Sequence, residues 1–134
     1  MNLAESIKRA RRVYLIGNGG SYANAQHIAN DLQACGIRAF TLDAAILTAT
    51  ANDFGYEFVF SKWIILHGEP LDLLIALSGS GKSLNILNAC EAAEKIGMDV
   101  HRIFGNERGE NMQEAENQQL RIGHEIMLWL KANR

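Results

Sequence analysis

Two short apolar segments of this sequence run directly into turns made of glycine and serine. Residues 13–17 read VYLIG and are followed by NGGS, and residues 71–79 read LDLLIALSG and are followed by SGKS. An apolar run of this length that ends at glycine is typical of a strand buried on both faces, as in a parallel sheet. A helical pattern follows each turn. These two junctions therefore favour an α/β fold.

The rest of the chain continues this alternation. We expect further strands at 37–42 and 99–105, a polar loop at 106–111, and helices at 3–11, 21–34, 44–52, 57–67, 82–96 and 112–132. Ser21 is expected to cap the helix after the first turn. This order predicts a doubly wound parallel sheet of four to five strands flanked by helices, in a flavodoxin-like three-layer sandwich. A chain of 134 residues is expected to form a single domain, residues 1–134.

Charge and apolar content exclude several classes of partner. The formal net charge is −2, which argues against nucleic-acid binding because that function needs clustered Lys and Arg. The basic run from Lys8 to Arg12 is too short to change this and is interpreted as the solvated end of the first helix. No apolar stretch has the length of a membrane span or the pattern of a signal peptide. We therefore expect a cytoplasmic protein without a membrane partner.

The two cysteines carry little functional information. Cys35 stands at the end of one expected helix and Cys90 within another, and the two lack the spacing of a zinc-binding Cys pair. A disulfide framework is not indicated either, so both are expected to be buried thiols in a reducing compartment.

The glycine-serine turns are the candidate ligand site. In sheets of this kind, ligands bind beyond the carboxyl ends of the strands, where helix N-termini offer free N–H groups. Ser78, Ser80 and Ser83 surround one such helix start and suit a phosphomonoester held by hydroxyls and backbone amides. The alternative is a turn that caps a helix without any ligand.

Two nucleotide-binding interpretations fit less well. GNGGSY places Gly17 and Gly19 as a dinucleotide fingerprint requires, but Tyr22 stands where its third glycine belongs. ALSGSGKS almost matches a nucleotide phosphate loop, with Ala76 in place of the first glycine. Only about fifty residues follow Ser83, and they contain one clear strand without a magnesium-binding Asp at its end, so an NTPase core hardly fits.

Four segments, in order along the chain, resemble the sugar isomerase (SIS) domain family, and within it the phosphoheptose (sedoheptulose 7-phosphate) isomerases. They are GNGGSYANAQHIANDL (17–32), LTATANDFGYEFVF (47–60), residues 73–98 and, more weakly, IGHEIMLWL (122–130). The resemblance implies substrate contacts at Asn18, Gly19, Gly20, Ser21, Asn52, Asp53, Ser78, Gly79, Ser80 and Ser83. Lys82 replaces an Asn of the family's phosphate loop and adds a positive charge there.

The resemblance also implies one zinc ion per site. The family's ligands correspond to His27, Asp31, Glu116 and His124, and Asp31 and His124 correspond to its catalytic acid and base. The spacing of His27 and Asp31 puts both on one helix face. Two residues depart from the family, which has Glu at position 31 and Gln at position 116; Asp is shorter by one methylene.

Alternatives for these four positions remain open. Glu116 and His124 are eight residues apart, about 12 Å along a straight helix. One ion could hold both only if the helix bends or neighbouring subunits share the site. Otherwise Glu116 is a solvated surface residue, and His27 could be a core histidine without a metal.

As an expectation from the resemblance, the chain is an aldose-ketose isomerase. It would interconvert sedoheptulose 7-phosphate and D-glycero-D-manno-heptose 7-phosphate through a cis-enediol, in heptose synthesis for surface polysaccharide. A homo-oligomer, dimer or tetramer, is expected, and relative to the family the N-terminal helix and a C-terminal edge strand are shortened. The alternative is a non-catalytic SIS module that binds a sugar phosphate or serves as a replication-initiator-binding adaptor.

Overall fold

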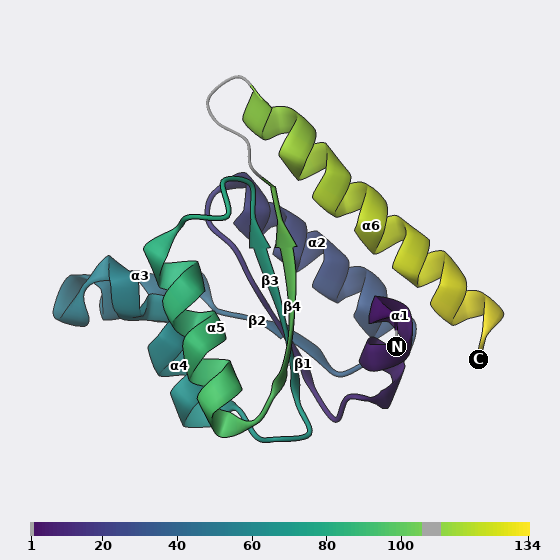
Figure 1. Ribbon diagram of the computed structural model, residues 1–134, viewed down its shortest axis with the longest axis horizontal. Helices are drawn as coiled ribbons and strands as arrows, with labels where there is room; N and C mark the ends of the chain where they lie inside the picture. Colours follow the sequence, from purple (N-terminus) through teal and green to yellow (C-terminus); the bar gives the residue numbers. More distant parts are fainter. Residues whose placement is uncertain (1, 106–110) are drawn as a thin grey trace.

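Four parallel strands form one sheet, in the order β2-β1-β3-β4, in the computed structural model of this chain (Figure 1). The structure describes residues 2–105 and 111–134. The strands are β1 (Val13–Ile16), β2 (Ala39–Thr41), β3 (Leu73–Ser78) and β4 (Asp99–Phe104). The sheet grows outward on both sides of the central β1–β3 pair, as in a doubly wound fold. The predicted fold class is confirmed, with four strands among the described residues.

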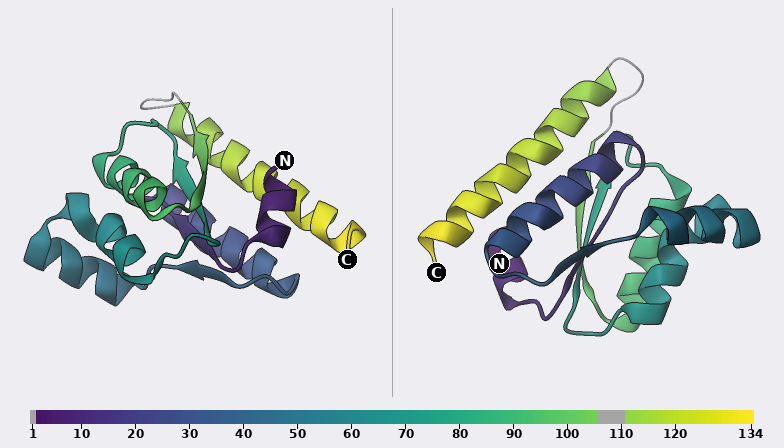
Figure 2. Two further views of the ribbon diagram at one scale, coloured as in Figure 1. Left: turned by 60° about the horizontal axis from the view of Figure 1, so that its bottom comes forward. Right: turned by 180° about the vertical axis from the view of Figure 1, so that it is seen from behind.

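Helices cover both faces of the sheet (Figure 1 and Figure 2). One face carries α1 (Leu3–Arg9), α2 (Gly20–Ala34) and α6 (Met112–Ala132). The other side carries α3 (Ala44–Phe54), the 3-10 helix η1 (Tyr56–Phe58), α4 (Val59–His67) and α5 (Leu84–Ile96). The helices α2 and α6 lie side by side, whereas α3 extends away from the sheet. None of the residues described in α3 is buried.

The two faces of the sheet form separate apolar layers. In β1, Val13 and Leu15 pack against α2 and α6, whereas Tyr14 and Ile16 pack against α4 and α5. Every residue of β3 is buried as well. This burial on both faces is what the apolar segments predicted, and each large side chain contributes about 1.5–3 kcal/mol.

The start of α2 differs from the prediction that Ser21 caps this helix. The helix begins at Gly20, and the N-cap is Gly19, whose φ of 54° costs little for a residue without a Cβ. Ser21 lies in the first turn and is 4% exposed. Among the described residues, no side chain caps α2, so N–H groups of its first turn remain available to a ligand.

Other differences are small. The strand expected at 37–42 is the three-residue β2, and the helix expected at 57–67 is divided into η1 and α4. The expected loop at 106–111 lies almost wholly outside the described residues. None of the helices in residues 2–105 and 111–134 combines the length and apolar character needed to cross a membrane.

Candidate functional site

A pocket opens at the carboxyl edge of the sheet, where β1 and β3 end. These strands are neighbours, with Ile16 paired to Ala76, so the turns that follow them lie side by side. The pocket has a volume of about 260 Å³ and is lined by Asn18, Gly19, Gly20, Ser21, Leu77, Ser78, Gly79, Ser80, Ser83, Met112 and Glu116. It therefore brings together the predicted substrate residues with the exception of Asn52 and Asp53.

The second turn has hydroxyl groups arranged for an oxyanion. Ser78 Oγ accepts a hydrogen bond from the N–H of Gly81 at 3.0 Å, and Ser80 Oγ accepts one from the N–H of Lys82 at 3.1 Å. A hydroxyl that accepts a backbone bond still has its own proton to donate. Ser83 is the N-cap of α5, where the helix dipole favours negative charge. This turn therefore suits a phosphate group.

Asn52 and Asp53 do not reach this pocket. Both lie on α3 and are exposed, and Asn52 Nδ2 donates to Asp53 Oδ1 at 3.1 Å. The physical reason is the direction of α3, which leads away from the sheet and its carboxyl edge (Figure 1). Neither residue lines the pocket, and their predicted contact with substrate stays a prediction.

The first turn is tied to residues that sequence reasoning missed. Asn18 and Asn85 exchange two hydrogen bonds: Asn18 Nδ2 donates to Asn85 Oδ1 at 2.8 Å, and Asn85 Nδ2 donates to Asn18 Oδ1 at 2.9 Å. Tyr56 donates its hydroxyl proton to Asn18 Oδ1 at 2.6 Å. The only signal in the sequence is a polar residue at position 85 on the buried face of a helix.

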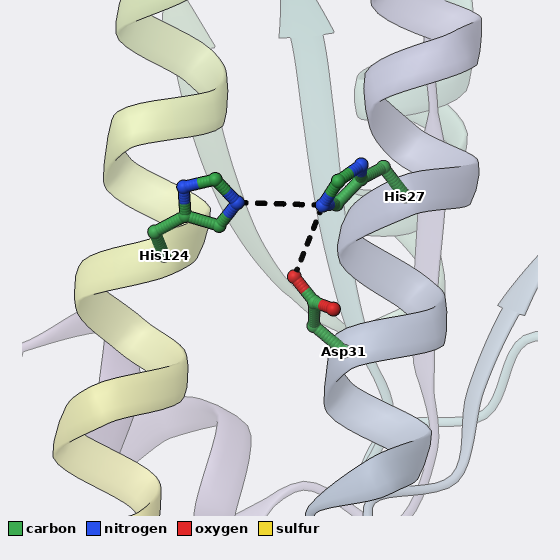
Figure 3. A group of neighbouring side chains, drawn as sticks. All are labelled: His27, Asp31 and His124. Carbon is green, nitrogen blue, oxygen red and sulfur yellow. Dashed lines mark hydrogen bonds and ion pairs between the residues drawn. The ribbon is translucent and has the colours of Figure 1, made fainter.

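A second group of polar side chains lies between α2 and α6. His27 and Asp31 extend from α2 toward His124 on α6 (Figure 3). The two Nε2 atoms of the histidines are 3.3 Å apart, and Asp31 Oδ2 is 3.4 Å from His27 Nε2. The side chain of His27 is 49% exposed and that of Asp31 only 16%. Solvent thus reaches the cluster from the histidine side, with the carboxylate beneath.

The contents of this cluster fit a divalent cation. Asp31 Oδ2 is buried and accepts no hydrogen bond from any group in the described part of the chain. Two zinc ligands in tetrahedral geometry, each about 2.0–2.1 Å from the ion, lie about 3.3 Å from each other. The separations at His27 match this value, and the three ligand atoms all lie within 4.8 Å of one another.

Close packing of the two helices brings the histidines together. A methyl group at Gly123 would lie 2.6 Å from Cγ1 of Ile28, which is too close for van der Waals contact. Only glycine at this position lets α6 approach α2 so closely. Because His124 follows Gly123 directly, this contact sets the spacing between His124 and His27.

Glu116, the predicted fourth ligand, is not in the cluster that the described residues form. It precedes His124 by eight residues on the same helix, and its carboxylate lies against Gly20 on the wall of the pocket. A Cβ at Gly20 would overlap that carboxylate. The straight course of α6 explains the separation, since eight residues span about 12 Å along a helix.

A buried amide joins α6 to the first turn. Gln119 is 2% exposed, and its Nε2 donates to Ser21 Oγ at 3.0 Å. Its Oε1 accepts a bond from Asn24 Nδ2 at 3.0 Å, and the same Nδ2 group donates to the carbonyl oxygen of Glu116 at 2.9 Å. This network, also missed from the sequence, fixes α6 against the start of α2 between the pocket and the cluster.

Comparison with known proteins identifies the family. Residues 1–105, well over half of the chain, match the family model of the SIS domain. The chain belongs to the SIS domain family. This SIS domain is 40% identical over 108 residues to the phosphoheptose isomerase of Rhodospirillum rubrum, an alignment that covers 75% of this chain and 57% of that protein. It spans about three fifths of the length of the first curated relatives.

Solved structures agree with this assignment. Phosphoheptose isomerase GmhA from Neisseria gonorrhoeae superposes with a TM-score of 0.84 at 25% identity, covering 97% of this chain and 81% of that one. A phosphoheptose isomerase from Francisella tularensis gives a TM-score of 0.87 at 25% identity, covering 96% and 82%. The SIS domain described here therefore has the architecture of these two proteins.

Proposed function

We propose that this chain is a zinc-dependent phosphoheptose isomerase that interconverts sedoheptulose 7-phosphate and D-glycero-D-manno-heptose 7-phosphate. The observation that carries this proposal is the cluster of His27, Asp31 and His124, in which a buried carboxylate oxygen of Asp31 has no hydrogen bond from the described residues and lies 3.4 Å from His27 Nε2. A module that only binds sugar phosphate has no need of such a cluster. The similarity to named phosphoheptose isomerases supports the choice of substrate.

The pocket holds the substrate by its two turns. The phosphate binds to the hydroxyls of Ser78, Ser80 and Ser83 at the start of α5. The sugar hydroxyls lie along the first turn, from Asn18 to Ser21. His27 follows Ser21 by six residues, about 9 Å along α2. An open-chain sugar phosphate held at the serine turn would extend past Ser21 toward this cluster.

Proton transfer is assigned to Asp31 and His124. One of them removes the proton from the carbon next to the carbonyl group and returns it to the neighbouring carbon, through a cis-enediol. The other moves a proton between the two oxygens. Imidazole suits this work near neutral pH, and Asp31 acts as a carboxylate base. Each has a second polar atom, Nδ1 or Oδ1, besides the one that faces the cluster.

His27, Asp31 and His124 are the residues that would hold zinc. When bound, the ion would polarise the carbonyl group and stabilise negative charge on oxygen. Glu116 is more than two helical turns from His124, and we assign it to the pocket wall, where its carboxylate can accept bonds from sugar hydroxyls.

We further propose that the chain works as a homo-oligomer. Large apolar side chains are exposed on α3 and α4: Ile46 at 55%, Phe54 at 58%, Ile65 at 65% and Leu66 at 77%. Exposed apolar groups gathered in this way favour an interface between proteins. Analytical ultracentrifugation of Leu66→Glu is expected to give a smaller species than wild type. Leu128→Glu, at a leucine of α6 that is 63% exposed, is the matched control and should leave the mass unchanged.

The activity is tested by incubating the purified chain with sedoheptulose 7-phosphate and zinc and following the aldose product by NMR. In D₂O, deuterium is expected on the carbon that receives the transferred proton, because an enediol exchanges protons with solvent through its base. Binding of sedoheptulose 7-phosphate without any isomerisation would instead identify a non-catalytic SIS module.

A further inference from the structure

The two turns of the pocket are joined by a pair of amide side chains, Asn18 and Asn85, and the mechanism above uses only Asn18. Asn18 belongs to the turn after β1, and Asn85 to the first turn of α5, which follows the serine turn. They are 67 positions apart in sequence, yet they exchange hydrogen bonds of 2.8 and 2.9 Å. Asn85 is 3% exposed and lies below the pocket, outside the set of lining residues.

In the structure, this pair leaves a particular group of Asn18 available to a ligand. Its Oδ1 accepts from both Asn85 and Tyr56, so both lone pairs of this oxygen are in use. One proton of its Nδ2 group goes to Asn85 Oδ1. The second N–H of Asn18 Nδ2 is the group of this side chain that the described residues leave free to bind a ligand. In this arrangement Asn18 offers a ligand a donor, toward a hydroxyl or carbonyl oxygen.

We propose that Asn85 is a positioning residue for the sugar phosphate, which acts by orienting the Asn18 amide as a donor and by fixing the spacing between the two turns. The inference rests on the proposed function, because it assumes a ligand that spans both turns. Such a ligand needs the correct spacing, whereas an isolated phosphate ion uses the serine turn alone. The two ligands should therefore respond differently when Asn85 is changed.

The test compares dissociation constants for sedoheptulose 7-phosphate and for inorganic phosphate in wild type and Asn85→Ala. The sugar phosphate is expected to bind about tenfold more weakly, the equivalent of one to two hydrogen bonds, and inorganic phosphate within about twofold of wild type. Glu91→Ala is the control, since Glu91 lies on the same helix and its carboxylate pairs with Lys95 on the surface. Equal losses for both ligands would overturn the proposal.

A double-variant cycle tests whether Asn85 acts through Asn18. Once Asn18→Ala has removed the amide that Asn85 holds, adding Asn85→Ala should change the affinity for sugar phosphate by less than about twofold. Additive losses would indicate a general structural role and overturn the inference. A wild-type chain that neither binds nor isomerises sedoheptulose 7-phosphate would instead contradict the proposed function.

Tyr56→Phe provides a second test of the same network, which can be used if the Asn85→Ala variant does not fold. Tyr56 is 51% exposed, so removal of its hydroxyl leaves the core intact. It deletes one of the two bonds to Asn18 Oδ1, and affinity for the sugar phosphate is expected to fall about threefold, with inorganic phosphate unaffected. No change for either ligand would contradict the role of this network.

Discussion

The pocket differs from the cluster of His27, Asp31 and His124 between α2 and α6, here called the α2–α6 cluster. The difference is in how their polar atoms are hydrogen-bonded. In the pocket, Asn18 is held by Asn85 and Tyr56, and the serine hydroxyls accept bonds from their own turn. In the cluster, two histidine nitrogens face each other and a carboxylate oxygen of Asp31 is buried without a hydrogen bond from the described residues. The polar atoms of the pocket are thus paired within the chain, whereas those of the cluster are arranged so that they could hold a cation.

This difference implies that the pocket binds the substrate and the cluster carries out the chemistry. A preformed pocket binds its ligand without paying for reorganisation, so sugar phosphate should bind with or without metal. A cluster with an unsatisfied carboxylate gains stability when it takes up a cation. Binding and chemistry should therefore be separable by substitution.

The largest expected effect comes from the cluster. His124→Ala should lower kcat by about a hundredfold or more, because it removes both a zinc ligand and an acid-base group. Affinity for sedoheptulose 7-phosphate should stay within about threefold of wild type. Isomerase kinetics and calorimetry measure the two quantities. Glu125→Ala, at the next and equally exposed position of α6, is the control. A loss of binding as large as the loss of turnover would show that the pocket and the cluster do not have separate roles.

An intermediate effect is expected from the contact between the helices. Gly123→Ala places a methyl group against Ile28 and should lower the free energy of unfolding by about 1–3 kcal/mol. It should also weaken zinc binding by separating His124 from His27. Denaturant unfolding and zinc titration measure both.

A compensating change distinguishes crowding from other causes. Ile28→Ala removes Cγ1 and Cδ1, the two atoms nearest to the new methyl group, so adding it to Gly123→Ala should restore part of the lost zinc affinity. Zinc affinity that is unchanged in Gly123→Ala would show that helix spacing does not set the site.

The smallest effect is expected in the serine turn. Ser80→Ala removes one hydroxyl donor among several, which is worth about 0.5–1.5 kcal/mol, and should raise KM several-fold with little change in kcat. Steady-state kinetics give both values. Ser61→Ala, at a buried serine on α4 that donates to a backbone carbonyl, controls for the loss of a hydroxyl elsewhere. A fall in kcat alone would place Ser80 in the chemistry.

The sequence predicted those parts of the fold that depend on residues close together in the chain. The burial of β1 and β3 followed from their apolar runs, and the pocket followed from glycine-serine turns at the ends of neighbouring parallel strands. The pairing of His27 with Asp31 followed from helical spacing. Each of these depends on residues close together in the chain.

Features that depend on packing between distant elements were not predictable in this way. Asn85 and Gln119 look like ordinary polar residues of a helix until the tertiary structure buries them. The sequence suggested Asp53 as a substrate contact and Glu116 as a metal ligand. The direction of α3 leaves Asp53 outside the pocket lining, and the straight course of α6 places Glu116 on the pocket wall instead of in the cluster. Gly123 reads as a helix-weakening residue and is in fact the contact that brings the histidines together.

The central claim is that the α2–α6 cluster holds the zinc ion on which isomerisation depends. The most direct test removes metal with a chelator and follows both turnover and binding of sedoheptulose 7-phosphate as zinc is returned. We predict that turnover disappears with the metal, that binding persists, and that one zinc ion per chain restores activity. Turnover that is equal in the metal-free and zinc-loaded protein would contradict the claim, as would binding without turnover at saturating zinc.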